Sequence, residues 1–429
     1  MQQVSFTNRK PTDDARAAQF RQARDLVLGS LGAYRIDEPR TASTAYVWPT
    51  AICPVGCGHC NFAAPPNVRD LARPRITRFG DELLAMLRDS QVWKAVLSGG
   101  GEPMMEPEFC KRFIAEVSSS ALEEIELITS AHFAGDLEAA RDTVAELAAA
   151  WRGRTPAPQP VSFTVRISVD WFHAARIGLE PAANLITVLS GDEYQDIGFY
   201  VRSVLLDGDR TMSDLAALLG GELSEIEDYQ QTIRLPDGRD ILIYYKNLIL
   251  DGRITKRKLD RLPVGMPDES RSEEFGKRFA TAAGGHIPAR TYNGPVVRQL
   301  DGLAMIFEDD GAVKILEGNA PDRIRRLGDL SSWAAVMDHY YADPITVFLV
   351  QEGPDALAQL VSERYPDAVS VGSEHNELYH LASRILETPE RALYATLRVL
   401  DQHLASGLVN ADPDVLAKAW ELLQETAQT

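Results

Sequence analysis

From Ser43 to residue 255, short apolar stretches alternate with amphipathic ones. The apolar stretches have the length of β-strands and lie at 44–51, 92–98, 124–129, 161–169, 198–206 and 241–248. Stretches with the helical period separate several of them, at 80–89, 108–118 and 135–150. This alternation predicts parallel strands joined by right-handed crossovers. Six such units are fewer than a closed eight-stranded barrel needs, so we expect an α/β fold, a partial (β/α)6 TIM-like barrel over 44–255.

The pattern changes on both sides of this region. Residues 1–43 are predicted to be an N-terminal leader with a helix near Asp14–Leu28. Residues 256–290 begin with a stretch dense in charged side chains and are predicted to be a linker. The functional side chains are expected at the carboxyl ends of the barrel strands, where the loops carry them.

Residues 291–429 are expected to form a smaller C-terminal α+β domain. Two apolar stretches, Leu303–Phe307 and Ala312–Leu316, flank the short polar segment Glu308–Gly311, which predicts a β-hairpin. After Trp333 the pattern is almost entirely helical.

Composition narrows the class of protein. The chain of 429 residues has a formal net charge of −18, which argues against a nucleic-acid partner held through its phosphates. No apolar run approaches the ~18 residues of a membrane span, and the first residues do not resemble a secretory signal. We therefore expect a cytoplasmic protein with no membrane partner, in which the four cysteines stay reduced.

Three of those cysteines, Cys53, Cys57 and Cys60, lie in one short loop directly after the first predicted strand. Glycines in the loop allow the thiolates to converge on one soft metal centre. A zinc site normally has four ligands in pairs, and the chain has no second cysteine pair. A cubane iron–sulfur cluster bound by three cysteines leaves one iron without a protein ligand, and a substrate or cofactor can bind there. Cys110, in a helical stretch, is interpreted as a packed core thiol.

The CxxxCxxC spacing, with the ring of His59 before the last cysteine, resembles the radical S-adenosylmethionine superfamily. The resemblance implies one [4Fe–4S] cluster on Cys53, Cys57 and Cys60, with S-adenosylmethionine chelating the fourth iron. It also implies that His59 packs near the adenine; otherwise His59 is a loop residue exposed to water.

Two further strand ends resemble motifs of the same family. Gly100, Gly101 and Glu102 follow the second strand like its GGE motif, which implies that the glycines and Glu102 bind the amino group of the cofactor's methionine moiety. A glycine turn alone is a weak signal. Ser168, at the end of the fourth strand, is implied to contact the cofactor's carboxylate or ribose, unless Ser168 and Asp170 simply cap the next helix. Arg202 on the fifth strand either pairs with that carboxylate or forms an ordinary salt bridge.

The C-terminal part resembles the SPASM or twitch extensions of such enzymes, but no cysteine follows Cys110. The segment 374–380 stands where ligand cysteines are expected in that resemblance, so it implies an extension without auxiliary clusters. Redox-neutral outcomes are then somewhat favoured over net oxidation of the substrate.

The resemblance implies an enzyme that cleaves S-adenosylmethionine reductively and abstracts a substrate hydrogen, with flavodoxin or ferredoxin as electron donor. A ribosomally made peptide is the first substrate class, and a sugar, nucleoside or amino acid of natural-product biosynthesis is the alternative. A non-catalytic protein whose cysteines only staple a loop around a metal is the second alternative. No residue is assigned to the hydrogen abstraction itself.

Overall fold

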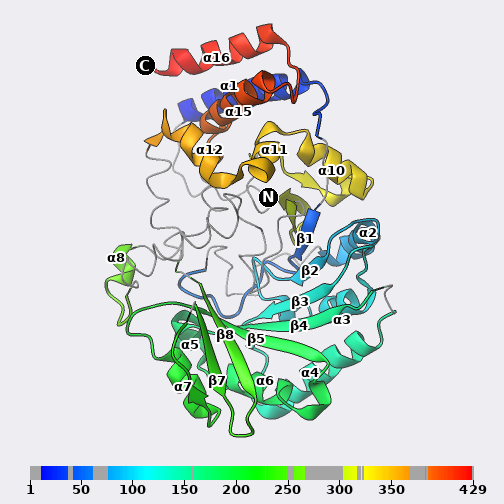
Figure 1. Cartoon of the computed structure of the whole chain (residues 1–429), viewed down its shortest axis with the longest axis vertical. Coiled ribbons are helices and arrows are strands. Elements are labelled where there is room, and N and C mark those ends of the chain that lie inside the picture. The colour runs from blue at the N-terminus through cyan, green and yellow to red at the C-terminus, as the bar shows by residue number, and fades with distance from the viewer. Residues whose placement is uncertain are drawn as a thin grey trace.

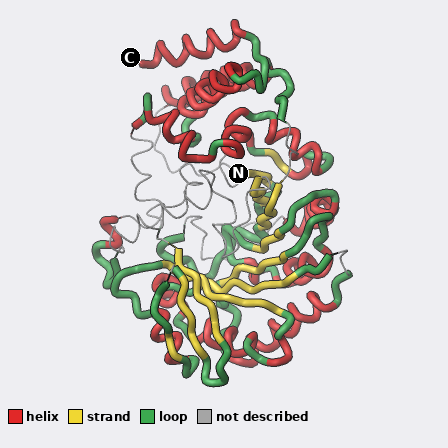
Figure 2. Tube along the Cα trace, viewed as in Figure 1, coloured by secondary structure: helices red, strands yellow, loops and turns green. Residues whose placement is uncertain are grey.

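The computed structural model describes residues 11–36, 42–60, 76–155, 159–227, 229–246, 248, 256–265, 303–315, 320, 323–366, 382 and 385–427. One sheet of eleven strands organises these residues, in the order β11-β10-β9-β1-β2-β3-β4-β5-β8-β7-β6. Figure 1 labels β1 to β5, β7 and β8 of this sheet, and Figure 2 shows the strands and helices by colour. The strands are β1 (Ala42–Val47), β2 (Lys94–Leu97), β3 (Glu124–Thr129), β4 (Ser162–Ser168), β5 (Ile197–Val204), β6 (Glu222–Leu223), β7 (Gln230–Arg234), β8 (Asp240–Lys246), β9 (Leu303–Phe307), β10 (Ala312–Ile315) and β11 (Arg325–Arg326).

The six strands predicted from the sequence are β1 to β5 and β8, and they are neighbours in the sheet. Each pairs in parallel with the next. The α/β class is therefore confirmed, with a mostly parallel sheet. The antiparallel strands β6 and β7, which extend the sheet beyond β8, were not predicted.

The two faces of this sheet differ in chemistry because side chains alternate along each strand. One face is apolar, with residues such as Leu97, Leu127 and Val165, and belongs to the main hydrophobic core. The helices that contribute to this core include α2 (Ile76–Arg88), α3 (Pro107–Glu116), α4 (Leu137–Arg152), α6 (Glu180–Leu189), α7 (Thr211–Leu218) and α10 (Trp333–Tyr341). The three predicted helices correspond to α2, α3 and α4.

The opposite face carries buried charged and hydroxyl groups. Lys94 Nζ lies 3.1 Å from Glu126 Oε2, and the Tyr200 hydroxyl donates a hydrogen bond to the same carboxylate. The Glu126 side chain is fully buried, so its charge depends on these partners. Burial alone would raise the pKa of Glu126. The charges of Lys94 and Arg166 lower this pKa by more, so the carboxylate is held ionised.

The predicted hairpin forms, and it joins the main sheet. Strands β9 and β10 pair antiparallel around the turn 308–311, as expected. Strand β9 also pairs in parallel with β1, with Tyr46 opposite Ile306. The hairpin therefore extends the main sheet, which the sequence interpretation had ended near residue 255.

A helical layer covers one end of the molecule. It contains α1 (Pro11–Gly29), α10 (Trp333–Tyr341), α11 (Pro344–Gln351), α12 (Gly353–Ser362), α15 (Pro389–Ala405) and α16 (Pro413–Ala427). Within the described residues, the helices from α10 onward confirm the helical pattern after Trp333. Helix α1 lies against α15 and α16, although most of the chain separates them (Figure 1).

A buried ion pair fixes α1 in this layer. Arg24 Nη2 lies 2.6 Å from Asp343 Oδ2, and Arg24 Nε donates to Thr396 Oγ1 at 2.9 Å. The described part of the predicted leader is thus a packed element of the C-terminal helices. The segment 374–380, on which the comparison with SPASM or twitch extensions depends, lies outside the described residues.

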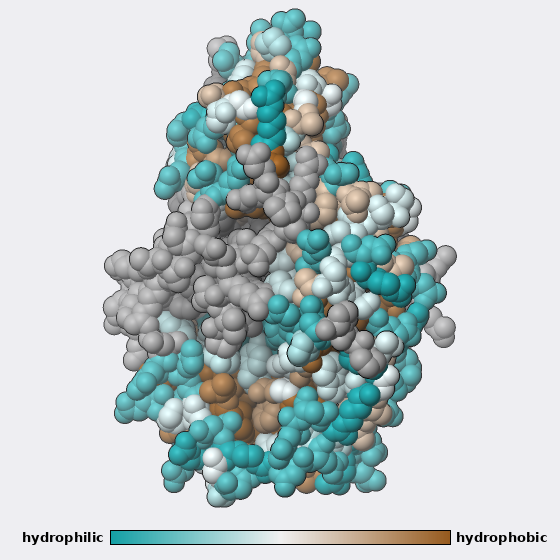
Figure 3. Space-filling model, turned by 45° about the vertical axis from the view of Figure 1, so that its right-hand side comes forward, coloured by the Kyte–Doolittle hydropathy of each residue, from teal (hydrophilic) through white to brown (hydrophobic). Residues whose placement is uncertain are grey.

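Part of the predicted linker is also packed. Helix α8 (Lys256–Leu259) and the residues up to 265 place Leu259 and Val264 in a buried cluster with the cysteine loop. The remainder of 256–290 lies outside the described residues. Polar residues cover much of the face seen in Figure 3, although apolar residues gather near its lower end. No helix in the described ranges has both the length and the hydropathy that a membrane crossing requires.

Candidate functional site

A cavity of about 220 Å³ lies at the carboxyl ends of the parallel strands. Every site residue predicted from the sequence lines it: Cys53, Cys57, His59, Cys60, Gly100, Gly101, Glu102, Ser168 and Arg202. These residues come from the loops after β1 and β2 and from the ends of β4 and β5. The fold therefore brings together residues that are far apart in the sequence.

The cysteine loop turns sharply after β1. Gly56 has a φ of 59°, a left-handed conformation that glycine adopts without strain, and Cys60 N donates to Cys57 O at 3.1 Å. Burial raises the pKa of the Cys53 thiol, while backbone N–H groups of Gly56 and Val55 donate to this sulfur and act in the opposite direction. Such N–H donors stabilise a thiolate and are one means by which proteins tune sulfur-ligated iron.

The loop after β2 contains Gly99, Gly100 and Gly101 and is called the glycine loop here. It packs directly against the start of the cysteine loop. Glu102 N donates to Ile52 O at 2.8 Å. A Cβ atom on Gly101 would lie 2.3 Å from Ile52 O and 2.6 Å from Thr50 O. Only glycine permits this approach, so Gly101 sets the position of one loop relative to the other.

The Glu102 carboxylate is buried and bonded by its own chain. Thr129 Oγ1 and Met104 N donate to Oε1 at 2.7 and 3.3 Å. Ser130 donates to Oε2 from its N and Oγ atoms at 2.8 and 2.6 Å. A carboxylate has about four acceptor positions, so these donors fill them. Glu102 thus braces the ends of β2 and β3 at the cavity wall.

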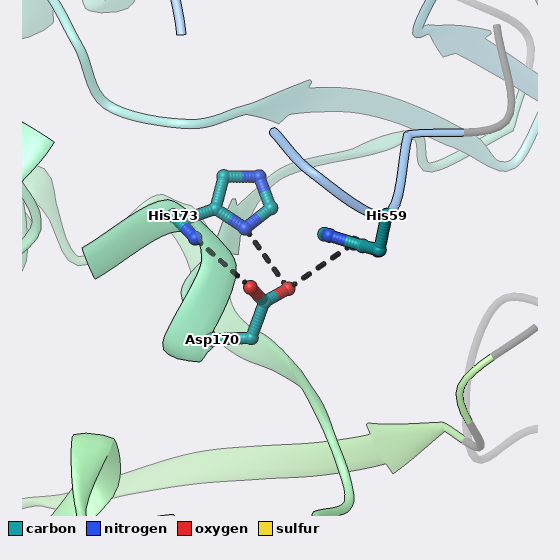
Figure 4. Close-up of side chains that lie close together, drawn as sticks. All are labelled: His59, Asp170 and His173. Carbon is teal, nitrogen blue, oxygen red and sulfur yellow. Dashed lines mark hydrogen bonds and ion pairs between the residues drawn. The ribbon is translucent and has the colours of Figure 1, made fainter. Parts of the chain in front are cut away.

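His59, Asp170 and His173 meet on one side of the cavity, where the cysteine loop faces α5 (Trp171–Ile177) (Figure 4). Asp170 Oδ2 lies 2.9 Å from His173 Nδ1 and 3.4 Å from His59 Nε2. The His59 ring packs on Phe172 with centroids 4.6 Å apart. His59 is therefore a packed side chain of the cavity wall rather than a residue exposed to water.

Burial and charge act in opposite directions on these three groups. Burial lowers the pKa of His59 to about 4, although Asp170 opposes the shift. Burial also disfavours the charged form of His173, but Asp170 outweighs it and holds the pKa of His173 well above its usual value. Burial raises the pKa of Asp170, yet the two histidines lower it more, and the carboxylate stays ionised.

The structure separates the two interpretations of Ser168 and Asp170. Asp170 caps α5, because its Oδ1 accepts from the backbone N of Phe172 and of His173 at 2.9 and 3.0 Å. Ser168 does not cap the helix; it is the last residue of β4 and lies opposite Arg202 in the strand register. Both Ser168 and Arg202 line the cavity.

Sequence reasoning assigned no role to Arg166, Ser130 or His173, which also line the cavity. A signal for Arg166 was present, since it precedes Ser168 by two residues and therefore lies on the same face of β4. Lys246, at the end of β8, also lines the cavity. The Tyr245 side chain lies on the other face of that strand, in the main core.

The donor set at the cavity suits a soft metal centre with an open position. Three free thiols from one loop line it, and soft thiolates select iron–sulfur clusters, zinc or copper(I). Cys110 is buried in α3 and donates to Pro103 O at 3.3 Å, as a core thiol does. Among the described residues, His59, Asp170 and His173 also form a group whose ligand atoms all lie within 4.8 Å of one another, close enough to hold a metal ion.

Comparison of the chain with known proteins adds no family to this description. Neither protein-family models nor curated proteins match it.

Proposed function

We propose that this protein is a radical S-adenosylmethionine enzyme with one [4Fe–4S] cluster on Cys53, Cys57 and Cys60. The observation that carries the proposal is the shared cavity. Three thiols, the glycine loop with Glu102, and the strand ends with Ser168 and Arg202 meet there, although they come from separate segments of the chain. The proposal also includes a partial-barrel architecture with its chemistry at the strand ends. It further includes a cytoplasmic location, where thiols stay reduced.

When bound, the cluster and S-adenosylmethionine would supply a 5′-deoxyadenosyl radical that abstracts a substrate hydrogen. The residues of the chain bind and orient the cofactor and shield the radical from water. Ser168 and Arg202, adjacent on β4 and β5, suit the carboxylate of the methionine moiety. The glycine loop lets backbone carbonyls approach its amino group, and Glu102 acts indirectly, by holding that loop through its bonds to Thr129 and Ser130.

We propose two classes of substrate. A ribosomally made peptide comes first, and a sugar, nucleoside or amino acid of natural-product biosynthesis is the alternative. An electron donor such as flavodoxin or ferredoxin belongs to either version.

The second candidate function is a non-catalytic metal-binding protein. The group of His59, Asp170 and His173 favours it, because two imidazoles and a carboxylate can hold zinc or ferrous iron without a cluster. In that case the glycine loop and Ser168 serve the fold alone.

Anaerobic reconstitution separates the two candidates. The enzyme proposal expects about four irons per chain and release of 5′-deoxyadenosine with dithionite and S-adenosylmethionine. Cys57→Ala should lose the cluster, whereas Cys110→Ala, a change at the core thiol, should keep it. Uptake of a single zinc or iron ion, with no 5′-deoxyadenosine, would support the second candidate instead.

A further inference from the structure

Helix α5 touches the cysteine loop at several separate points. Asp170 Oδ2 lies 3.4 Å from His59 Nε2, and the ring of Phe172 packs against the ring of His59. Arg176 Nε donates to Val55 O at 3.0 Å, between residues 121 positions apart in the chain. The loop is therefore held by side chains of a helix that follows a different strand, β4.

Packing also brings the centre of the loop against the same helix. A Cβ atom on Gly58 would lie 3.4 Å from Phe172 Cδ1, so the backbone passes directly over that ring. Val55, Cys57 and Phe172 belong to one small buried cluster, to which α8 contributes Leu259.

Asp170 joins the helix and the loop through a single carboxylate. Oδ1 accepts from the first backbone N–H groups of α5 and sets where the helix begins. Oδ2 faces both imidazoles, one from the loop and one from the helix (Figure 4). The residue is only 2% exposed, so water does not compete for these bonds.

We propose that α5 preorganises the cysteine loop for its metal, with Asp170 as the positioning residue that connects the two. The inference rests on the proposed function only in taking the loop as a metal-binding loop. A short loop with two glycines otherwise samples many conformations, and the ordering entropy is then lost when the metal binds. We call the contacts that Asp170, Phe172 and Arg176 make with the cysteine loop the clamp. Because the clamp orders the loop beforehand, metal binding does not bear that cost.

Hydrogen exchange of the metal-free protein tests the clamp directly. Asp170→Asn keeps the helix cap, because Asn caps as well as Asp, but it removes the charge that faces the histidines. Amides in 53–60 should exchange roughly tenfold faster or more, since a bond to a buried charged group is lost. The matched control is Asp136→Asn, the same change at the cap of α4, where Asp136 is exposed and accepts from Ala139 N at 2.8 Å.

A second variant reaches the clamp without changing Asp170. Arg176→Met removes the bond to Val55 O and should also speed exchange in 53–60. Both variants should bind iron more weakly in competition with a chelator, by about the factor by which exchange rises. Unchanged exchange and unchanged iron affinity in both variants would overturn the proposal.

The same set of experiments separates this inference from the proposed function. If the wild-type protein releases 5′-deoxyadenosine while both variants keep wild-type exchange, the clamp is wrong and the function stands. If the variants loosen the loop but the wild type takes up no cluster, the clamp stands and the function fails. Tight zinc binding by a protein with Cys53, Cys57 and Cys60 all changed to Ala would overturn the positioning role, because His59, Asp170 and His173 would then be the metal ligands.

Discussion

Gly101→Ala should displace the cysteine loop, and the size of the effect follows from the contact distances. The added Cβ would lie 2.3 Å from Ile52 O, 2.6 Å from Ile52 N and 2.6 Å from Thr50 O. Carbon atoms normally approach such neighbours to about 3.5 Å, so the overlap is roughly 1 Å. Overpacking commonly costs about 1–3 kcal/mol. All three atoms here belong to the backbone, which no rotamer change can move, so we expect a cost near about 3 kcal/mol.

Two measurements check this prediction, with Gly135→Ala as the control. Gly135 precedes α4, and a Cβ atom added there would have no neighbour within 4 Å, so its change should stay within about 0.5 kcal/mol. Urea unfolding of the metal-free proteins gives the free energies, and iron analysis after reconstitution shows whether the loop still binds metal. A Gly101→Ala protein with wild-type stability and full iron content would refute the packing argument.

Three further predictions concern buried polar groups. Arg24→Met should lower the free energy of unfolding by about 3 kcal/mol, since it leaves the buried Asp343 carboxylate with fewer partners; a loss below about 1 kcal/mol in denaturant unfolding would show that α1 is held by apolar contacts alone. Burial lowers the pKa of His403 to about 4, so between about pH 6.5 and 4 the unfolded chain binds a proton that the folded chain does not, and stability falls as the pH falls. His403→Gln should remove roughly 2 kcal/mol of that fall, measured by unfolding at several pH values, and an unchanged pH profile would contradict it. Ser130→Ala should cost about 1.5–3 kcal/mol, because the buried Glu102 carboxylate loses a hydroxyl donor; equal stability of the variant and wild type in urea unfolding would mean that the Ser130 hydroxyl does not contribute to this brace.

Local pattern was sufficient for the elements that carry the site. Alternation of apolar stretches identified β1 to β5 and β8 because each strand buries one face against helices, and that constraint acts residue by residue. The hairpin of β9 and β10 was predictable for the same reason, since its turn and both strands are adjacent in the chain.

Pairings between distant segments left no such pattern. The parallel contact of β9 with β1 joins residues more than 250 positions apart, such as Tyr46 and Ile306, and neither strand differs locally from one that pairs elsewhere. Arg24 appears in the sequence as an ordinary charged residue of a surface helix, although it is fully buried against Asp343. Such contacts depend on the whole fold rather than on neighbouring residues.

The site was predictable where chemistry depends on spacing within one segment, as in the cysteine loop. The roles of Glu102 and Asp170 were not, because they depend on donors from other strands and helices. Sequence reasoning gave Glu102 a direct bond to a cofactor, whereas Thr129, Ser130 and Met104 already donate to it. For Asp170, helix capping was foreseen, but its contact with the loop histidine was not.

The most direct test of the central claim is an electron paramagnetic resonance spectrum of the reduced, reconstituted protein with and without S-adenosylmethionine. A cluster on Cys53, Cys57 and Cys60 has one iron without a protein ligand, so the account predicts that the cofactor changes the signal of the reduced cluster. A spectrum that is the same with and without S-adenosylmethionine, or a reconstituted protein with no cluster signal, would contradict it.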